Sequence, residues 1–312
     1  MTIGATAPLN IDVEREKWLS NPDTYNPQFT YTDEEAALRA ARTVKASGVL
    51  AGMAERVLEG VLQRHGSESG YHQAVWGEVL TRDEADEMVS DYLFQNGMDG
   101  LVRVVWSRKS LVTNFSHNTA KQRFAGTLRL VAREGYYRRE RLRGLLDHEL
   151  GTHMTRAFNH RASSPPWSLP KPPYFLSLAS EEGLASLNTH QYLADTSLFQ
   201  PALLYWSCHQ ASGASFCELG RRMRRFVDDP SRVWLECVRA KRGLTDTSLP
   251  GGLAKDQSTF DGIVRLLRFR GRLDPTVLHS CKVSLETYEE AQRAASRRGG
   301  GGGGGGRSCR AL

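Results

Sequence analysis

The sequence has no apolar run of the roughly 20 residues that a membrane-crossing helix takes. Residues 1–19 mix acidic and basic side chains and lack the apolar core of a secretory signal, so no export signal is evident. None of the five cysteines belongs to a Cys-x-x-Cys pair, and their spacing matches no disulfide framework. These absences predict a protein with no membrane partner that works in the reducing, cytoplasmic compartment.

Motifs of nucleic-acid binding are also missing. The formal net charge is +6, yet the chain has no zinc-finger spacing and no aromatic-rich RNA-binding signature. A run of cations is usually a solvated helix face, whereas a basic surface would attract an acidic polypeptide. We therefore expect no nucleic-acid partner, and an acidic protein is the partner that the charges favour. The cations cluster in 138–143, 221–225 and 265–272.

The length of 312 residues allows one large domain or two intimate ones with a sizeable core. Paired Asn-Pro steps make residues 1–30 an extended, turn-rich N-terminal segment in this interpretation. A folded domain is expected over 31–290. A disordered, Gly/Arg-rich tail is expected over 291–312, because the glycine run 299–306 has no side chain to bury.

The apolar periodicity predicts an α+β protein that is mostly helical. Thr81 with Glu84 forms a capping-box pattern at the start of one helix. A connection rich in proline, 161–178, is not expected to be helical. Helices are predicted within 33–64 with a break near Gly48, from Thr81, over 138–158, from Glu181 and around 260–269, and a small sheet over 101–106, 111–115 and 123–131.

The most informative stretch is His148-Glu149-Leu150-Gly151-Thr152-His153. In a zinc-peptidase helix, two histidines at i and i+4 direct both rings to one ion. Here the spacing is i and i+5, which on a regular α-helix turns the second ring by about 140°. A local π-type turn would bring the rings together, and Gly151 inside the gap tolerates such a deformation. The motif therefore predicts a metal site on a widened helix.

A carboxylate from a second helix would complete a Zn²⁺ site with His148 and His153 as ligands. Glu181 and Glu182 both precede Gly183, and adjacent helical residues diverge by about 100°, so one of them faces the metal easily. We choose Glu182 as the ligand, with Gly183 permitting close approach to the motif helix. Glu181 is then an outer partner or an exposed residue. Glu149, beside the metal, is predicted to be the catalytic general base.

Together with other segments, the motif resembles the microtubule-associated tyrosine carboxypeptidases. The resemblance implies a zincin-like catalytic domain over 31–290, with a small sheet beside the His-Glu-x-x-x-His helix. It also implies removal of the C-terminal tyrosine of α-tubulin in the cytoplasm, on the microtubule cytoskeleton. The family's metal ligands fall on His148, His153 and Glu182, and its catalytic glutamate on Glu149. The resembling segments are 25–29, 148–153, 181–186, 215–219, 238–243, 245–248, 255–257 and 261–263.

Two alternatives stay open at this point. One is a metallopeptidase that acts on another acidic C-terminal tail, and the other is a catalytically silent microtubule-binding module. A purely structural zinc site has no need of a general base, so Glu149 argues against the second.

Several roles around the motif also stay open. Asp147 and Thr152 could hydrogen-bond a ligand imidazole or be plain helix surface. The candidates are Arg239, Lys241, Arg242 and Lys255 for holding the terminal carboxylate; Tyr174, Phe175, Tyr192 and Tyr205 for the tyrosine pocket; and Tyr205, His190 and His209 for the transition-state donor.

Overall fold

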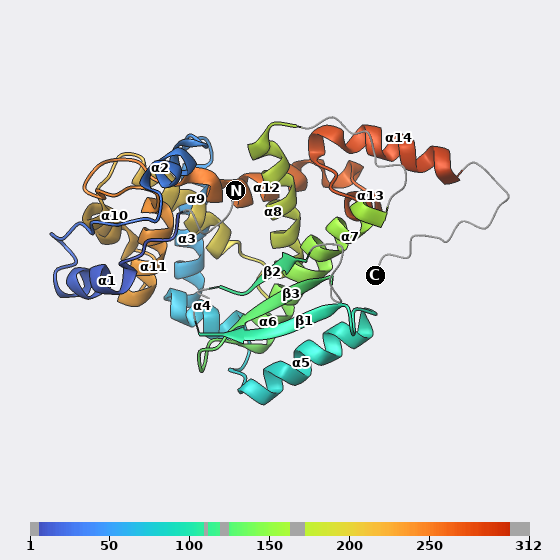
Figure 1. The fold of residues 1–312 in the computed structure, drawn as a ribbon, viewed down its shortest axis with the longest axis horizontal. Coiled ribbons are helices and arrows are strands. Elements are labelled where there is room, and N and C mark those ends of the chain that lie inside the picture. The colour runs from blue at the N-terminus through green and yellow to red at the C-terminus, as the bar shows by residue number, and fades with distance from the viewer. Residues whose placement is uncertain (1–5, 109–111, 119–124, 163–171, 300–312) are drawn as a thin grey trace. The chain divides into compact units, whose positions relative to one another are not determined.

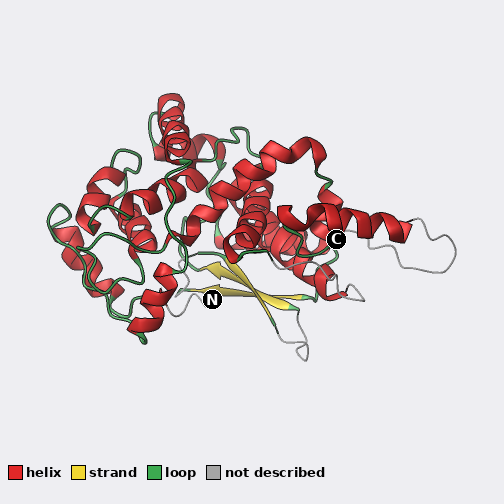
Figure 2. Ribbon diagram, turned by 90° about the horizontal axis from the view of Figure 1, so that it is seen from above, coloured by secondary structure: helices red, strands yellow, loops and turns green. Residues whose placement is uncertain are grey.

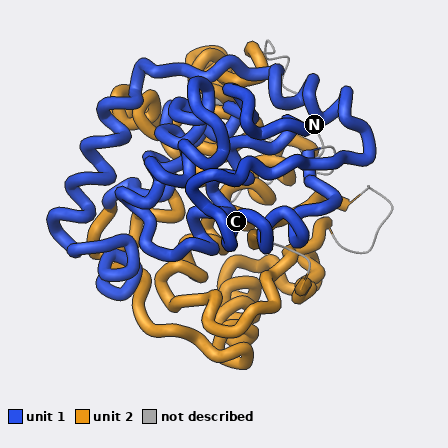
Figure 3. The backbone as a smooth tube through the Cα atoms, turned by 90° about the vertical axis from the view of Figure 1, so that its left-hand side faces the viewer, with its two compact units in different colours: residues 1–74, 197–261 blue, residues 75–196, 262–312 orange. Residues whose placement is uncertain are grey.

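The computed structural model describes residues 6–108, 112–118, 125–162 and 172–299. The chain divides into two compact units, which Figure 3 draws in different colours. Unit 1 comprises residues 1–74 and 197–261, and unit 2 comprises 75–196 and 262–312. The region 31–290, expected as one folded domain, is therefore shared between two units. In the described part of the chain, no helix has the length and apolar content that crossing a membrane takes.

Unit 1 is helical. Two of its helices begin at sequence signals that satisfy free backbone N–H groups: Ser215 and Glu218 form a capping box, and Asp229 caps a helix with Pro230 in its first turn. An aromatic cluster of Trp18, Phe216 and Trp234 lies at its core, with ring centroids 5.1–5.8 Å apart. The elements are α1 (Ile11–Ser20), α2 (Glu34–Arg42), α3 (Ala51–His65), α4 (Glu68–Val75, ending at the border), α9 (Phe199–Ala211), α10 (Phe216–Met223), α11 (Pro230–Lys241) and η3 (Ala254–Asp256).

The expectation of an extended segment over residues 1–30 is wrong, because this segment contains helix α1. The helix is hard to read from the sequence since one of its two buried residues, Glu14, is charged. The Glu14 carboxylate accepts hydrogen bonds from Tyr25 Oη at 2.7 Å and from the Gln28 backbone N–H at 2.8 Å. These bonds satisfy a buried charge that would otherwise be costly.

Three of the sequence segments that carry the family resemblance are hydrogen-bonded to one another in unit 1. The side chain of Asn26 accepts from the Cys217 backbone N–H at 3.0 Å, and the Thr247 hydroxyl donates to the Pro27 carbonyl at 2.7 Å. The Phe29 N–H donates to the Thr245 carbonyl at 2.8 Å. Residues 25–29 are therefore held to 215–219 and 245–248 by hydrogen bonds between segments far apart in the chain.

Unit 2 contains the predicted small sheet (Figures 1 and 2). The strand order is β1-β3-β2, with β1 parallel to β3 and β2 antiparallel to it. The predicted capping box at Thr81 and Glu84 is present at the start of α5. The elements up to the border are α5 (Arg82–Gln95), β1 (Val102–Ser107), β2 (Asn114–His117), β3 (Gly126–Val131), α6 (Arg139–Leu146), the π-helix η2 (Asp147–Met154), α7 (Thr155–Ala162) and α8 (Tyr174–His190).

The predicted helix over 138–158 forms as a continuous run of α6, η2 and α7. Its core face is made of leucines and a methionine that pack with buried residues of α5 and the sheet. Strand β2, the edge of the sheet, lies against η2. The core thus fixes η2 between the sheet and α8, and its core-facing members are Leu142, Leu146, Leu150 and Met154.

The C-terminal part is more helical than expected. The helix predicted around 260–269 is α12 (Gln257–Phe269), and the short η4 (Arg270–Arg272) follows it. Beyond it lie α13 (Pro275–Ser280), η5 (Leu285–Thr287) and α14 (Tyr288–Gly299). The tail expected to be disordered from residue 291 is therefore helical as far as Gly299, and 300–312 lie outside the described residues.

The Pro-rich connection is shorter than predicted. The helix before it, α7, continues to Ala162, and α8 already begins at Tyr174. Residues 163–171 lie outside the described part of the chain. The Glu181-Glu182 pair consequently lies inside α8, rather than at the start of a helix as predicted.

Candidate metal centre

The helix widens where the sequence requires it. Asp147–Met154 is a π-helix, in which hydrogen bonds join residues five apart. Two threonine hydroxyls reinforce this geometry by donating five residues back, Thr152 to the Asp147 carbonyl and Thr155 to the Leu150 carbonyl, each at 2.9 Å. Residues 148 and 153 therefore stand on one face. The ring centroids of His148 and His153 are 4.8 Å apart.

Glu182 of α8 faces these two rings. Its Oε2 lies 3.8 Å from His148 Nε2 and 3.9 Å from His153 Nε2. One donor atom from each of the three residues lies within 4.8 Å of the other two. The structure thus brings together the three residues that the sequence proposed as ligands, and Glu182 rather than Glu181 faces both Nε2 atoms.

The donor set suits a divalent ion such as zinc. Two imidazoles and one carboxylate form a common three-ligand zinc set that leaves one position open. Donors about 2.1 Å from a tetrahedral ion are about 3.4 Å apart, so small side-chain movements would close the 3.8–3.9 Å spacings. Burial lowers the pKa of His148 to about 3, which favours the neutral ring that ligation requires.

The second ring nitrogens have partners that fix ring orientation. His148 Nδ1 lies 3.1 Å from Thr189 Oγ1, and His153 Nδ1 lies 2.9 Å from Glu181 Oε1. Asp147 and Thr152, the candidates from the sequence for bonding a ligand imidazole, have other partners. Asp147 accepts a hydrogen bond from Tyr92 Oη, and the Thr152 hydroxyl donates to the Asp147 carbonyl. Thr189 was not identified from the sequence, although its place at i+7 from Glu182 puts both on one face of α8.

Glu181 is an outer partner of the cluster. Its Oε2 accepts from Arg156 Nη1 at 2.6 Å, and its Oε1 lies 3.0 Å from Lys282 Nζ. Burial would raise the pKa of Glu181, but the Arg156 guanidinium and the hydrogen bond with His153 hold it below its usual range. Arg156 and Lys282 were not identified from the sequence. Arg156 follows His153 by three residues, a spacing that places both on one helix face.

Glu149 is held by the edge strand. The Phe115 backbone N–H donates to Glu149 Oε2 at 2.7 Å. Burial raises the pKa of Glu149 to about 7, although nearby His153 and the Phe115 hydrogen bond act in the opposite direction. A carboxylate with a pKa near neutrality can both accept and return a proton at physiological pH.

Close helix approach near the site comes from a different glycine than predicted. A Cβ at Gly144 of α6 would lie 2.4 Å from the Thr189 carbonyl oxygen of α8. Gly183, expected to face the motif helix, instead faces α12 at Gly262. Gly144 therefore lets α6 and α8 approach each other near the site.

The candidates for the terminal carboxylate lie in unit 1. Lys241 is fully buried, and its ammonium donates to the carbonyls of Ala211, Ala214 and Leu249. Arg239 and Arg242 both bind Asp256. For these three cations the structure shows internal partners, which argues against the role proposed from the sequence.

The other candidates also have defined places. Tyr205 and His209 belong to unit 1, where Tyr205 is buried and its Oη accepts from the Leu50 N–H. His190 Nδ1 donates to the Ser186 carbonyl at 2.7 Å. Tyr174 and Tyr192 of unit 2 are about half exposed, and the Arg143 guanidinium lies 4.0 Å from the Tyr192 ring centroid.

The three basic clusters differ in their contacts. In the first, Arg139 pairs with Glu78, and Arg141 and Arg143 stack on aromatic rings. The second pairs with acids of unit 1, Arg221 and Arg224 with Asp23 and Arg225 with Glu55 and Glu59. In the third, Arg265 pairs with Glu286. Within the described residues, no acidic partner is found for its exposed members Arg268, Arg270 and Arg272.

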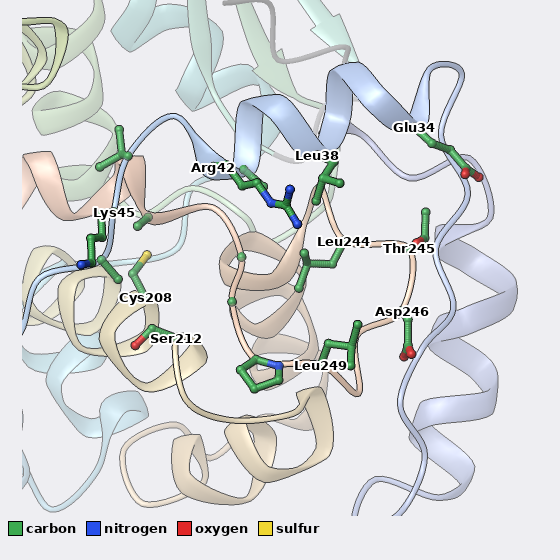
Figure 4. Close-up of a pocket in the computed structure, with 18 of the residues that line it drawn as sticks. Glu34, Leu38, Arg42, Lys45, Cys208, Ser212, Leu244, Thr245, Asp246 and Leu249 are labelled. Atoms are coloured by element: carbon green, nitrogen blue, oxygen red, sulfur yellow. The ribbon is translucent and has the colours of Figure 1, made fainter.

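Unit 1 has a separate open cavity of about 730 Å³ (Figure 4). Its wall carries both Arg42 and Lys45 and the acids Glu34, Glu35 and Asp246. None of the three proposed metal ligands lines it. Its charges nearly cancel, so it has no preference for a ligand of one sign.

The fold and this cluster define an α+β, mostly helical protein in which two imidazoles and a carboxylate converge. No protein family model matches the chain. It is 36% identical over 92% of its length to "Microtubule-associated tyrosine carboxypeptidase 1" of Rattus norvegicus, and 37% identical over 90% to the Homo sapiens protein of that name. The chain is thus a homologue of the microtubule-associated tyrosine carboxypeptidases, which confirms the resemblance seen in the sequence.

The similarity covers only part of the length of these relatives. The chain spans 61% and 59% of the length of these two relatives. Among solved structures, it is similar to "the putative lipoprotein from Colwellia psychrerythraea", with a TM-score of 0.51 and 13% identity over 95% of this chain and 57% of that one. At this identity the likeness concerns the fold alone.

Proposed function

We propose that this protein is a zinc-dependent carboxypeptidase with a zincin-like catalytic domain, which removes the C-terminal tyrosine of α-tubulin in the cytoplasm. The observation that carries the proposal is the convergence of His148, His153 and Glu182, with Glu149 beside them, in a homologue of the tyrosine carboxypeptidases. A zinc ion bound there would supply a Lewis acid that polarises the scissile carbonyl and acidifies water.

The residues of the chain provide the remaining steps. Glu149, fixed through Oε2 by the Phe115 N–H, takes a proton from the attacking water and returns it to the leaving amine. Thr189 and Glu181 hold the two imidazoles at their Nδ1 atoms, which leaves each Nε2 on the side of Glu182, where it would be available to hold the ion. Burial raises the pKa of Glu149 towards neutrality, which favours this exchange.

The substrate assignment comes from the relatives, whose names describe a tyrosine carboxypeptidase associated with microtubules. The exposed Arg268 of α12 and Arg270 and Arg272 of η4 are consistent with an acidic protein partner such as tubulin. The proposal thus combines the chemistry of the site with the specificity in the names of the homologues.

The direct test measures metal content and tyrosine release for the wild type and Glu149→Gln. Peptides ending in Glu-Tyr, Glu-Phe and an unrelated residue are compared with stabilised microtubules as substrates. The variant should keep its zinc and lose about 10²- to 10⁴-fold in kcat, the usual contribution of a general base. A variant that cleaves at the parental rate would contradict the mechanism.

The same experiment separates the alternatives. Cleavage of peptides with other acidic tails but not of those ending in tyrosine would favour a different acidic substrate. Microtubule binding without any release of tyrosine by the zinc-loaded wild type would favour a silent binding module.

A further inference from the structure

A carboxypeptidase must distinguish a free C-terminal carboxylate from an internal peptide bond. A positively charged donor provides this distinction through a charge-assisted hydrogen bond. Three of the four cations considered from the sequence have internal partners in unit 1. A cation beside the proposed metal centre, with part of its side chain exposed, is the better candidate for this task.

Lys282 of unit 2 lies beside the outer partner of the proposed metal centre. Its Nζ lies 3.0 Å from Glu181 Oε1, and the same oxygen lies 2.9 Å from the Nδ1 atom of His153. The side chain of Lys282 is 43% exposed, whereas that of Arg156, the other cation bound to Glu181, is 1% exposed. Lys282 is thus a partly exposed cation that contacts the outer carboxylate of the cluster.

The backbone around Lys282 is fixed by Arg156. The Arg156 guanidinium donates to the carbonyls of Cys281 and Val283, the two residues that flank Lys282. It also donates to Glu181 Oε2. One buried guanidinium therefore positions both the backbone that carries Lys282 and the carboxylate that orients His153, which is the arrangement expected of a preorganised site.

The local charge leaves Lys282 able to bind an anion. Glu181 carries one negative charge and contacts two cations, so Arg156 alone is enough to balance it. Other cations lie near: burial first, and then the charges of Arg161 and Lys282, lower the pKa of His117 to about 4. An incoming carboxylate would meet a positively charged side of the site.

We propose that Lys282 binds the free C-terminal carboxylate of the substrate, with Arg156 and Glu181 as positioning residues. This inference rests on the proposed carboxypeptidase function and names the group that makes the enzyme specific for a chain end. The ligand class is a free peptide α-carboxylate, and a C-terminal amide is the matched compound that should not be recognised.

The first test measures binding rather than turnover. In a Glu149→Gln background loaded with zinc, calorimetry compares a peptide ending in Glu-Tyr with the same peptide as its amide. The background protein should prefer the free acid, and Lys282→Met should weaken binding of the acid about 10- to 100-fold without changing binding of the amide. Lys282→Arg keeps the charge and should keep most of the preference.

The second test measures kinetics in the active protein. Lys282→Met should lower kcat/KM for the free acid by a similar factor, mainly through KM, with unchanged zinc content and melting temperature. The control is Arg103→Met, which removes an exposed charge on β1 and should behave as the wild type. Loss of zinc, or an acid-over-amide preference that survives in Lys282→Met, would overturn the inference.

The two proposals fail in different ways. If the wild type releases no tyrosine but binds the acid through Lys282, the proposed function is wrong and the binding site stands. If the wild type releases tyrosine and Lys282→Met does so equally well, the proposed function stands and the role of Lys282 is wrong.

Discussion

Gly183 of α8 packs its backbone directly against the backbone of Gly262 in α12. A Cβ at Gly183 would lie 2.5 Å from the carbonyl carbon of Gly262, and a Cβ at Gly262 would lie 1.8 Å from the carbonyl oxygen of Ala179. Backbone atoms cannot move aside as the end of a flexible side chain can. The glycine pair therefore sets the position of α8, the helix that carries Glu181 and Glu182.

Gly183→Ala should accordingly damage the proposed metal centre as well as the fold. We expect a loss of about 1–3 kcal/mol in the free energy of unfolding, as for overpacking, and weaker zinc binding because α8 must shift. Denaturant unfolding and metal titration measure the two effects. The control is Gly213→Ala, where an added Cβ meets nothing within 4 Å. If Gly183→Ala binds zinc and unfolds as the wild type does, the proposed packing constraint is wrong.

Local signals in the sequence predict much of the secondary structure of unit 2. The capping box at Thr81, the three short strands and the helix with the motif all follow from spacing and residue type, because each depends on neighbours in the chain. The i and i+5 histidines required a widened turn, and the structure has one. The sequence also predicts that Glu182 faces the histidines, but the close approach of Gly183 is to α12 and not to the motif helix.

Features that depend on distant residues were missed. The buried face of helix α1 is not apolar in the sequence because it includes the charged Glu14. The Glu14 carboxylate is hydrogen-bonded by Tyr25 and by a backbone N–H fourteen residues away. Around the proposed metal centre, Arg156 bonds to the Cys281 carbonyl and Glu181 to Lys282, in each case more than 100 residues further along the chain. No periodicity within one element carries this information.

The widened helix can be tested at Gly151. A Cβ there would lie 2.9 Å from Tyr92 Oη, which is itself bonded to Asp147 Oδ1 at 2.9 Å. Gly151→Ala should destabilise the wild type by about 1 kcal/mol, even though alanine is the better helix former. In a Tyr92→Phe background the hydroxyl is gone, and the same change should be neutral or stabilising by up to about 1 kcal/mol.

A double-mutant cycle by denaturant unfolding measures this coupling. Strict additivity of the two substitutions would show that the Gly151–Tyr92 contact does not limit the residue at position 151. Metal titration of the same four proteins would report whether the π-helix keeps its form.

Asp256 provides a prediction about acid stability. It is buried and pairs with Arg239 and, at 3.3 Å, with Arg242. Burial would raise its pKa, but the two guanidinium groups lower it below the ordinary 3.8. Because the native pKa is lowered, the ion pair contributes stability above about pH 3.8 that is lost as the pH falls through the native pKa.

Asp256→Asn should therefore destabilise the protein by about 2–3 kcal/mol near pH 7, less than for a fully buried pair because the Arg239 side chain is 36% exposed. The gap between the variant and the wild type should shrink at about pH 3. Urea unfolding at both pH values measures this difference in the free energy of unfolding. A gap that stays constant would mean that the charge of Asp256 does not contribute.

The end of α12 and the following η4 offer a test of the proposed acidic partner. Arg268, Arg270 and Arg272 are exposed, and the described part of the chain shows no acid paired with them. Replacing all three with alanine should weaken binding to microtubules about tenfold at low salt and reduce its salt dependence, because exposed cations mainly act through long-range attraction. The matched control removes three charges that have internal partners, Arg221, Arg224 and Arg225. Sedimentation with microtubules at two salt concentrations compares the two triple variants. If both weaken binding equally, the effect comes from net charge rather than from this surface.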